Sequence, residues 1–200
     1  MKNIYIALIL VCFTGVWVFA YTEHNIQSAN FLATKGVIND NSANIADYNL
    51  GDHITRREML KVMMNLSDVV VSDNCNGSFS DMNSSDWGCK YAEAALAAWF
   101  IAANTNYRPD DNVTLIEALK MIMQAKEIVR DENTDWRAGY VSKAKTEEIV
   151  DEGYFEYDLK ATRGWIFSSS ARSYDDFTYT EADVEIEPEI EELFKSLLDL

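Results

Sequence analysis

One spacing occurs three times in this chain: an aromatic residue is followed, seven positions later, by a threonine that can start a helix. The pairs are Tyr48 with Thr55, Tyr107 with Thr114, and Phe155 with Thr162. A spacing that returns along a chain indicates one supersecondary unit used repeatedly, and such units bury their apolar faces against one another. The sequence therefore predicts three similar units that share one interior.

The clearest helix of each unit begins at the threonine. Thr55 with Glu58, and Thr114 with Glu117, fit the capping-box pattern, in which a hydroxyl and a carboxylate each accept a hydrogen bond from a backbone N–H. Apolar residues then follow at helical spacing. The third copy has Trp165 in place of the glutamate, which predicts a weaker cap.

An earlier helix is expected in each unit. Residues 26–35 form it in the first unit, and Gly36 ends it. In the second unit Ser85-Asp86 offers a start before Trp87, and in the third Asp135 offers one before Trp136. The first unit also carries a polar insertion at 39–47, which reads as a loop.

The N-terminal segment has the features of a secretory signal peptide. Lys2 precedes an apolar run that ends at Val18-Phe19-Ala20. An uncleaved membrane anchor is the alternative, because the run of about 17 residues is at the lower limit for spanning a bilayer. We therefore expect a secreted chain, attached to a membrane only if residues 1–20 are retained.

Export also bears on the cysteines. Removal of residues 1–20 leaves Cys75 and Cys89, and an even pair in an exported chain predicts a disulfide. Two unpaired thiols are the alternative. In the loop-entropy description, closing a loop of about 15 residues stabilises a fold by about 3 kcal/mol.

The charge of the chain limits its partners. The formal net charge is −16, and the acidic residues are concentrated in the tail at 175–200. Nucleic acid is excluded, because its binding needs a basic surface. An anionic ligand would need local basic clusters. The tail is either solvated or a segment that recruits an envelope protein partner.

The motifs resemble those of the S-layer homology family. The family order is F-x-D, a Trp near a helix start, aliphatic residues, an aromatic-x-P loop and a T-R-A-E helix start. The second unit has Phe79-Ser80-Asp81, Trp87, Tyr107-Arg108-Pro109 and Thr114-x-x-Glu117; the first has 54–58, I-T-R-R-E; the third has Asp131, Trp136 and 161–163, A-T-R.

The resemblance implies a mostly α fold: three helix-loop-helix repeats around a pseudo-threefold axis, with a central helical bundle and grooves between repeats. The expected domains are a signal peptide at 1–20, repeats at 21–68, 69–127 and 128–174, and the acidic tail at 175–200. It also implies anchoring at the cell surface by binding secondary wall polysaccharide or a peptidoglycan-linked glycan, often pyruvylated, with no cofactor.

The same resemblance implies the site residues, which are Arg56, Arg163, Trp87, Trp136, Asp81 and Asp131. Arginine suits this role because its planar fork of donors matches a carboxylate. Each residue also has a structural reading: the tryptophans as core, the aspartates as turn caps, and Arg56 as the partner of Glu58 or another acid. Leu115 replaces the arginine in the second repeat, so one or two working grooves are expected.

No catalytic or metal-binding pattern is present in the sequence. His24 and His53 lie in no triad or ligand spacing, and the Asp/Asn clusters at 74–77 and 110–112 do not complete a calcium loop, so they read as turns. A non-enzymatic glycan-binding module is the first hypothesis. The second is an extracellular protein-interaction scaffold with degenerate grooves, whose acidic tail recruits the partner.

Overall fold

The computed structural model describes residues 23–180, in which every named regular element is a helix, and this confirms the predicted α class. The predicted signal peptide at 1–20, and the part of the acidic tail at 181–200, lie outside the described residues. Over the range 23–180 no helix combines the length and apolar character needed to cross a membrane. The helices are α1 (Glu23–Thr34), the 3-10 helix η1 (Ile45–Tyr48), α2 (Arg56–Leu66), α3 (Cys89–Ala97), α4 (Leu115–Ala125), α5 (Trp136–Thr146) and α6 (Arg163–Arg172).

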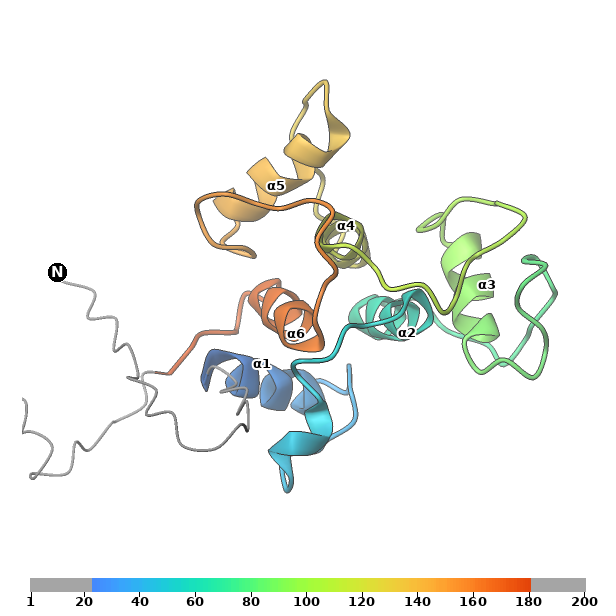
Figure 1. Cartoon of the computed structure of the whole chain (residues 1–200), viewed down its shortest axis with the longest axis horizontal. Helices are drawn as coiled ribbons and strands as arrows, with labels where there is room; N and C mark the ends of the chain where they lie inside the picture. The colour runs from blue at the N-terminus through green and yellow to red at the C-terminus, as the bar shows by residue number, and fades with distance from the viewer. Residues whose placement is uncertain (1–22, 181–200) are drawn as a thin grey trace, which may run out of the picture.

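Three inner helices are surrounded by three outer ones. In Figure 1, α2, α4 and α6 lie at the centre, with α1, α3 and α5 around them. The outer helices pack as α1 on α6, α3 on α2 and α5 on α4, while α4 contacts both α2 and α6. Each outer helix therefore packs on the inner helix of the unit before it, and α1 closes the circle on α6. The packed pairs straddle the boundaries expected between repeats.

The predicted helix starts at the threonines are confirmed. The Thr55 hydroxyl accepts from the Glu58 N–H, and the Glu58 carboxylate accepts from the Thr55 N–H; α4 begins with the same reciprocal pair at Thr114 and Glu117. At α6 the Thr162 hydroxyl accepts from the Trp165 N–H without a returning carboxylate, as the sequence predicted.

Two of the three outer helices begin or end as expected. Asp135 caps α5 by accepting from the Arg137 N–H, and Gly36, with φ of 74°, follows the end of α1. The prediction for α3 was wrong, because this helix begins only at Cys89 and has no side-chain cap. The Asp86 carboxylate instead accepts from the Gly88 N–H (2.8 Å) in the turn before the helix.

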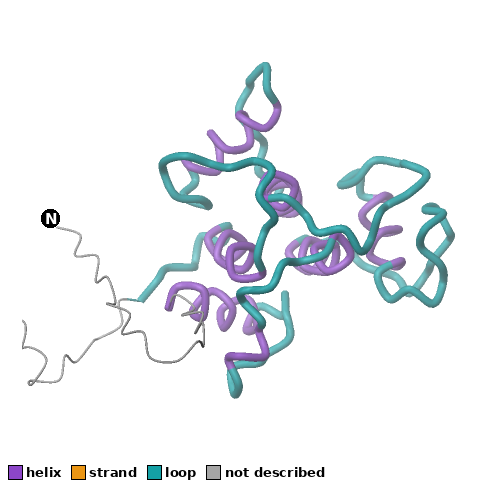
Figure 2. Tube along the Cα trace, viewed as in Figure 1, coloured by secondary structure: helices purple, strands orange, loops and turns teal. Residues whose placement is uncertain are grey.

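A closed ring of three backbone hydrogen bonds joins the units. The Ile54 N–H donates to the Ala161 carbonyl (3.3 Å), Ala161 donates to Val113 (3.0 Å), and Val113 donates back to Ile54 (3.2 Å). These residues are buried and directly precede the three cap threonines. Figure 2 shows the loops that lead into α2, α4 and α6 meeting beside these helices. Because buried backbone groups must be paired, each unit satisfies polar groups of the other two.

The segment after α6 belongs to the folded part of the chain up to the last described residue. The Gln27 side chain donates to the Thr180 carbonyl and accepts from the Thr180 N–H, both at 2.9 Å. The ring of Phe177 packs on Phe31, with centroids 4.8 Å apart. Residues 175–180, which the sequence placed with the acidic tail, therefore cover α1.

Candidate functional site

Arg163 joins the third unit to the first. It is the first residue of α6, and its Nε donates to the Tyr48 carbonyl (3.0 Å) while Nη1 donates to Oε1 of Glu58 (3.2 Å). Its backbone N–H donates to the Asp52 carbonyl (2.8 Å). We call this set of contacts the first seam.

Arg56 joins the first unit to the second in the same way. Its Nε donates to the Tyr107 carbonyl (2.9 Å), and Nη1 donates to Oε1 of Glu117 (3.3 Å). The guanidinium carbon lies 4.7 Å from the centre of the Tyr107 ring. We call this the second seam. The sequence allowed a structural ion pair for Arg56, and the structure identifies the partner as Glu117, 61 residues along the chain.

The third seam has no guanidinium at the equivalent position. Leu115 is the first residue of α4, and its N–H donates to the Leu159 carbonyl (2.8 Å) as the two arginine N–H groups do elsewhere. Trp165 occupies the place of Glu58 and Glu117 in the repeated pattern. The backbone docking is therefore kept at all three seams, whereas the ion pair is kept at two.

A groove of about 250 Å³ lies at the first seam. It brings together two of the predicted site residues, Arg163 and Trp87, which come from different units. Trp87 is 47 % exposed and stands edge-on to Tyr91, so it is not a core residue. The other lining residues include Tyr48, Glu58, Lys61, Asn39, Asn41 and Phe167.

Trp136 repeats the arrangement of Trp87 at the second seam. It is 42 % exposed and stands edge-on to Tyr140, with ring centroids 6.0 Å apart. The Lys120 ammonium lies 5.5 Å from the centre of the Trp136 ring. Both predicted tryptophans are therefore half-exposed and lie beside basic side chains.

Two lysines were missed by the sequence reasoning. Lys61 and Lys120 each follow a cap threonine by six positions, and this shared offset is the signal that could have identified them. Within residues 23–180, neither ammonium has a carboxylate oxygen within 4.0 Å, although most arginines there do. Lys61 lines the groove together with Glu58, which pairs with Arg163, so among the described residues the Lys61 ammonium adds a positive charge that forms no ion pair.

The two predicted aspartates hold loops and are absent from the groove lining. The Asp81 carboxylate accepts from the backbone N–H groups of Tyr107 (2.8 Å) and Arg108 (2.7 Å). Burial acts to raise the pKa of Asp81, but these two hydrogen bonds hold it below its ordinary value. Asp131 accepts from the Ser142 hydroxyl (2.5 Å). Both contacts correspond to the turn-capping reading of these residues.

A depression of larger volume, about 910 Å³, lies at the third seam, and different side chains line it. In the repeated pattern His24 takes the place of Trp87 and Trp136, and Ser168 takes that of the two lysines. Tyr179 covers both, with its ring stacked 4.0 Å from that of His24 and its hydroxyl 2.7 Å from Ser168 Oγ. The chain's own segment thus occupies this position.

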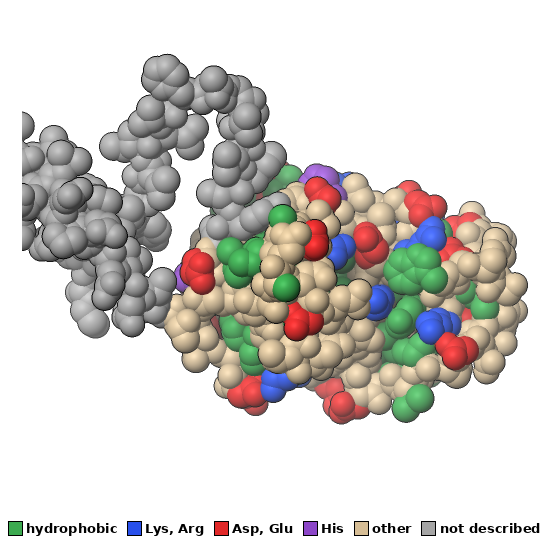
Figure 3. Space-filling view, turned by 90° about the horizontal axis from the view of Figure 1, so that it is seen from below, with side chains coloured by type: hydrophobic (Ala, Val, Ile, Leu, Met, Phe, Trp, Pro, Cys, Tyr) green, Lys and Arg blue, Asp and Glu red, His purple; other side chains and the backbone are tan. Residues whose placement is uncertain are grey.

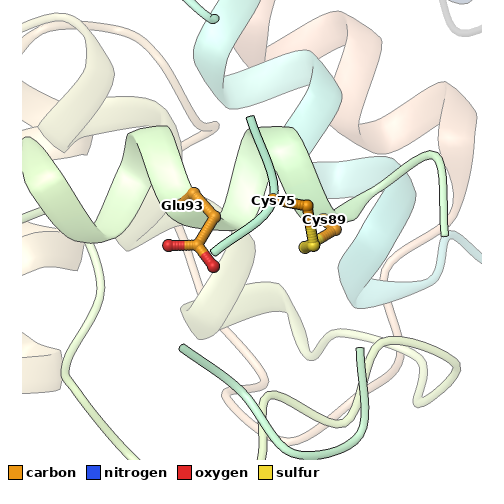
Figure 4. A group of neighbouring side chains, drawn as sticks. All are labelled: Cys75, Cys89 and Glu93. Carbon is orange, nitrogen blue, oxygen red and sulfur yellow. A yellow bond between two sulfur atoms is a disulfide. The ribbon is translucent and has the colours of Figure 1, made fainter. Parts of the chain in front are cut away.

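The predicted disulfide between Cys75 and Cys89 is confirmed, with Cα atoms 5.5 Å apart (Figure 4). Glu93, which lies beside it, accepts from the backbone N–H groups of Asn76 (3.1 Å) and Ser78 (2.9 Å). The closed loop contains both Asp81 and Trp87. The disulfide therefore fixes the segment that presents Trp87 to the groove.

The described face of the molecule in Figure 3 carries no large basic field. Figure 3 shows acidic, basic and apolar side chains interspersed on the face it presents. With a formal net charge of −16, attraction of an anion depends on local groups such as Lys61 and Arg163.

A comparison with family models identifies the second unit. Residues 78–119 match the model of the S-layer homology domain, a range that runs from the disulfide loop through α3 into α4. A search of curated proteins returned no match. A domain of this family indicates cell-wall anchoring, and hence association with the cell surface, in general terms. The chain therefore carries a match to the S-layer homology domain at residues 78–119.

Proposed function

We propose that the chain is an exported, non-enzymatic anchoring module of three S-layer homology repeats, at 21–68, 69–127 and 128–174, around a pseudo-threefold axis. It binds an anionic cell-wall glycan in the groove of the first seam and at the equivalent residues of the second. Lys61 and Lys120 contact the acidic group of the glycan, while Trp87 and Trp136 contact the faces of its sugar rings.

The groove at the first seam is the observation that carries this proposal. It combines the half-exposed face of Trp87, the ammonium of Lys61 and the side-chain amides of Asn39 and Asn41. An aromatic face offers apolar contact to a sugar ring, an ammonium pairs with a carboxylate, and amides bond to hydroxyl groups. A site with an apolar wall and a few convergent polar groups is typical of small-ligand recognition.

In this proposal the role of Arg163 and Arg56 is not limited to direct contact with the glycan. Glu58 and Glu117 already accept from Arg163 and Arg56, so each guanidinium enters the site partly neutralised. Arg163 and Arg56 hold adjoining repeats at the spacing that the site needs. Lys61 and Lys120, which form no ion pair among the described residues, supply the net positive charge that an anionic glycan requires.

The experiment is a pull-down of the purified chain on cell-wall sacculi, either untreated or chemically stripped of secondary wall polysaccharide. Binding should depend on the polysaccharide and should fall at least tenfold in the double variant Lys61→Met/Lys120→Met, since a charge-assisted contact is worth about 1.5–3 kcal/mol.

A matched control removes two lysines outside the seams. Lys90→Met/Lys143→Met changes the net charge equally. It breaks surface pairs with Asp73 and Glu147, which contribute little to stability, and removes the Lys90 ammonium from the face of Tyr91. Sacculi should retain this variant as well as the unaltered chain. Equal retention of both double variants, or retention independent of the polysaccharide, would overturn the proposed function.

A further inference from the structure

Arg57 is a basic residue next to the first-seam groove that the function described so far does not use. It is the second residue of α2, where the family pattern T-R-A-E has alanine. Its side chain is only 20 % exposed and crosses from the first unit to the second. There its Nη1 lies 3.2 Å from Oδ1 of Asp86, and its Nη2 pairs with Asp110.

The same side chain lies over Trp87. The guanidinium carbon is 5.8 Å from the centre of the Trp87 ring, within the range of cation–π attraction. Trp87 also makes an edge contact with the ring of Tyr91. Two contacts from different units therefore limit where the indole can turn.

Gly88 makes this approach possible. A Cβ atom at Gly88 would collide with the Cγ and Cδ methylenes of Arg57. The Asp86 oxygen that receives Arg57 also accepts from the Gly88 N–H (2.8 Å). The ion pair and the turn that carries Trp87 are thus one connected arrangement.

We propose that Arg57 is a positioning residue that holds Trp87 as a pre-set platform for the sugar ring at the first seam. The inference rests on the proposed function. Fixing a side chain before the ligand arrives reduces the entropy lost on binding. The equivalent residues of α4 and α6 are Ile116 and Gly164, so the other seams lack this support.

The two seams consequently differ. At the second seam the lysine itself, Lys120, lies over Trp136. At the first seam Arg57 takes that place, which leaves Lys61 available to the ligand. The first seam is therefore the tighter of the two glycan sites.

The first test needs no ligand. The purified chain is labelled with fluorotryptophan, and each fluorine resonance is assigned by a Trp→Phe variant. Arg57→Met should shift and sharpen the Trp87 resonance, as expected of a more mobile ring, and leave that of Trp136 unchanged. Asp86→Asn should do the same to a smaller extent. An unmoved Trp87 resonance in both folded variants would overturn the proposal.

The second test measures affinity for a pyruvylated hexosamine, with the unmodified hexosamine as the reference sugar. In a Trp136→Ala background, which leaves the first seam, Arg57→Met should weaken binding roughly fivefold and Arg57→Lys less. In a Trp87→Ala background, Arg57→Met should have no further effect, because its action passes through Trp87. The exposed Arg108→Met is the charge-matched control and should change nothing.

The outcomes separate the two proposals. Equal loss in both backgrounds, or no loss in either, contradicts the role of Arg57 while leaving glycan binding intact. Failure of the unaltered chain to bind the sugar and the wall polysaccharide contradicts the proposed function, and the fluorine spectra still decide whether Arg57 positions Trp87.

Discussion

Glu58 divides its carboxylate between its own helix and Arg163. Oε2 accepts from the Thr55 N–H (2.8 Å), and Oε1 accepts from Nη1 of Arg163 (3.2 Å), 105 residues along the chain. Glu117 does the same for Thr114 and Arg56. One residue thus starts an inner helix and ties it to the neighbouring unit.

Substitutions at Glu58 should separate these two roles. Glu58→Gln keeps an oxygen for the Thr55 N–H but turns an ion pair into a neutral contact, and should lower the free energy of unfolding by about 0.5–1 kcal/mol. Glu58→Ala also loses the carboxylate half of the capping box, while the Thr55 hydroxyl still caps the helix, and should cost about 2 kcal/mol. Chemical denaturation measures both. Glu147→Gln, which breaks only a surface pair with Lys143, should cost less than about 0.5 kcal/mol, and an equal cost would contradict the shared role.

Breaking the disulfide should affect the first seam more than the second. Cys75→Ser/Cys89→Ser should lower the free energy of unfolding by about 2–4 kcal/mol, since the loop is no longer closed in the unfolded chain. Trp87 lies inside this loop and Trp136 does not, so only Trp87 should gain mobility. Fluorine spectra of labelled tryptophans would show this, and equal changes at both rings would refute it.

Asp81 should give the fold a pH dependence on the acid side. Its native pKa is held below the unfolded value of about 3.9, so the unfolded chain takes up the proton first as pH falls. The contribution is complete above the unfolded pKa and is lost as pH falls through the native pKa. Asp81→Asn should therefore cost about 1 kcal/mol near neutral pH, after allowance for solvent screening, and almost nothing in strong acid.

Denaturation at several pH values tests this, with Asp131→Asn as the comparison. Asp131 accepts one hydrogen bond, from the Ser142 hydroxyl, whereas Asp81 accepts two from backbone N–H groups. The loss at Asp131 should be the smaller. A cost at Asp81 that does not change with pH would contradict the assigned cause.

Tyr179 should stabilise the third seam through its hydroxyl and its ring. Tyr179→Phe removes the bond to Ser168 and should cost about 0.5–1 kcal/mol, while Tyr179→Ala also removes the stack on His24 and should cost about twice that. The neighbouring exposed Thr178→Ala is the control and should leave the melting temperature unchanged. Retention on sacculi should persist in all three, because the proposed sites lie at the other seams.

Local features of the fold could be predicted from the sequence. Thr55 and Thr114 start helices because the cap depends on residues three positions apart, and Cys75 and Cys89 form a bridge that export chemistry favours. The α3 start was misplaced because Asp86 is also the acceptor for Arg57, a contact between units that local spacing does not contain.

The candidate site was harder to predict for the same reason. Arg56 and Arg163 lie at the helix starts where the pattern placed them, but their acceptors, Tyr107 and Tyr48, are 51 and 115 residues away. Lys61 and Lys120 have no motif of their own. They matter because, within residues 23–180, the fold places no carboxylate oxygen within 4.0 Å of their ammonium groups, which is a property of packing and not of spacing.

The backbone hydrogen bonds among Ile54, Val113 and Ala161 form a closed ring, in which the three positions are equivalent. Because α1 returns to pack on α6, and Gln27 meets Thr180, the described chain ends beside its own beginning. A circularly permuted gene that joins these ends and opens at the exposed segment 72–74 would encode the same three docking contacts in a different order. The three units therefore depend on one another, and removal of any one would leave two that cannot complete the ring of backbone hydrogen bonds.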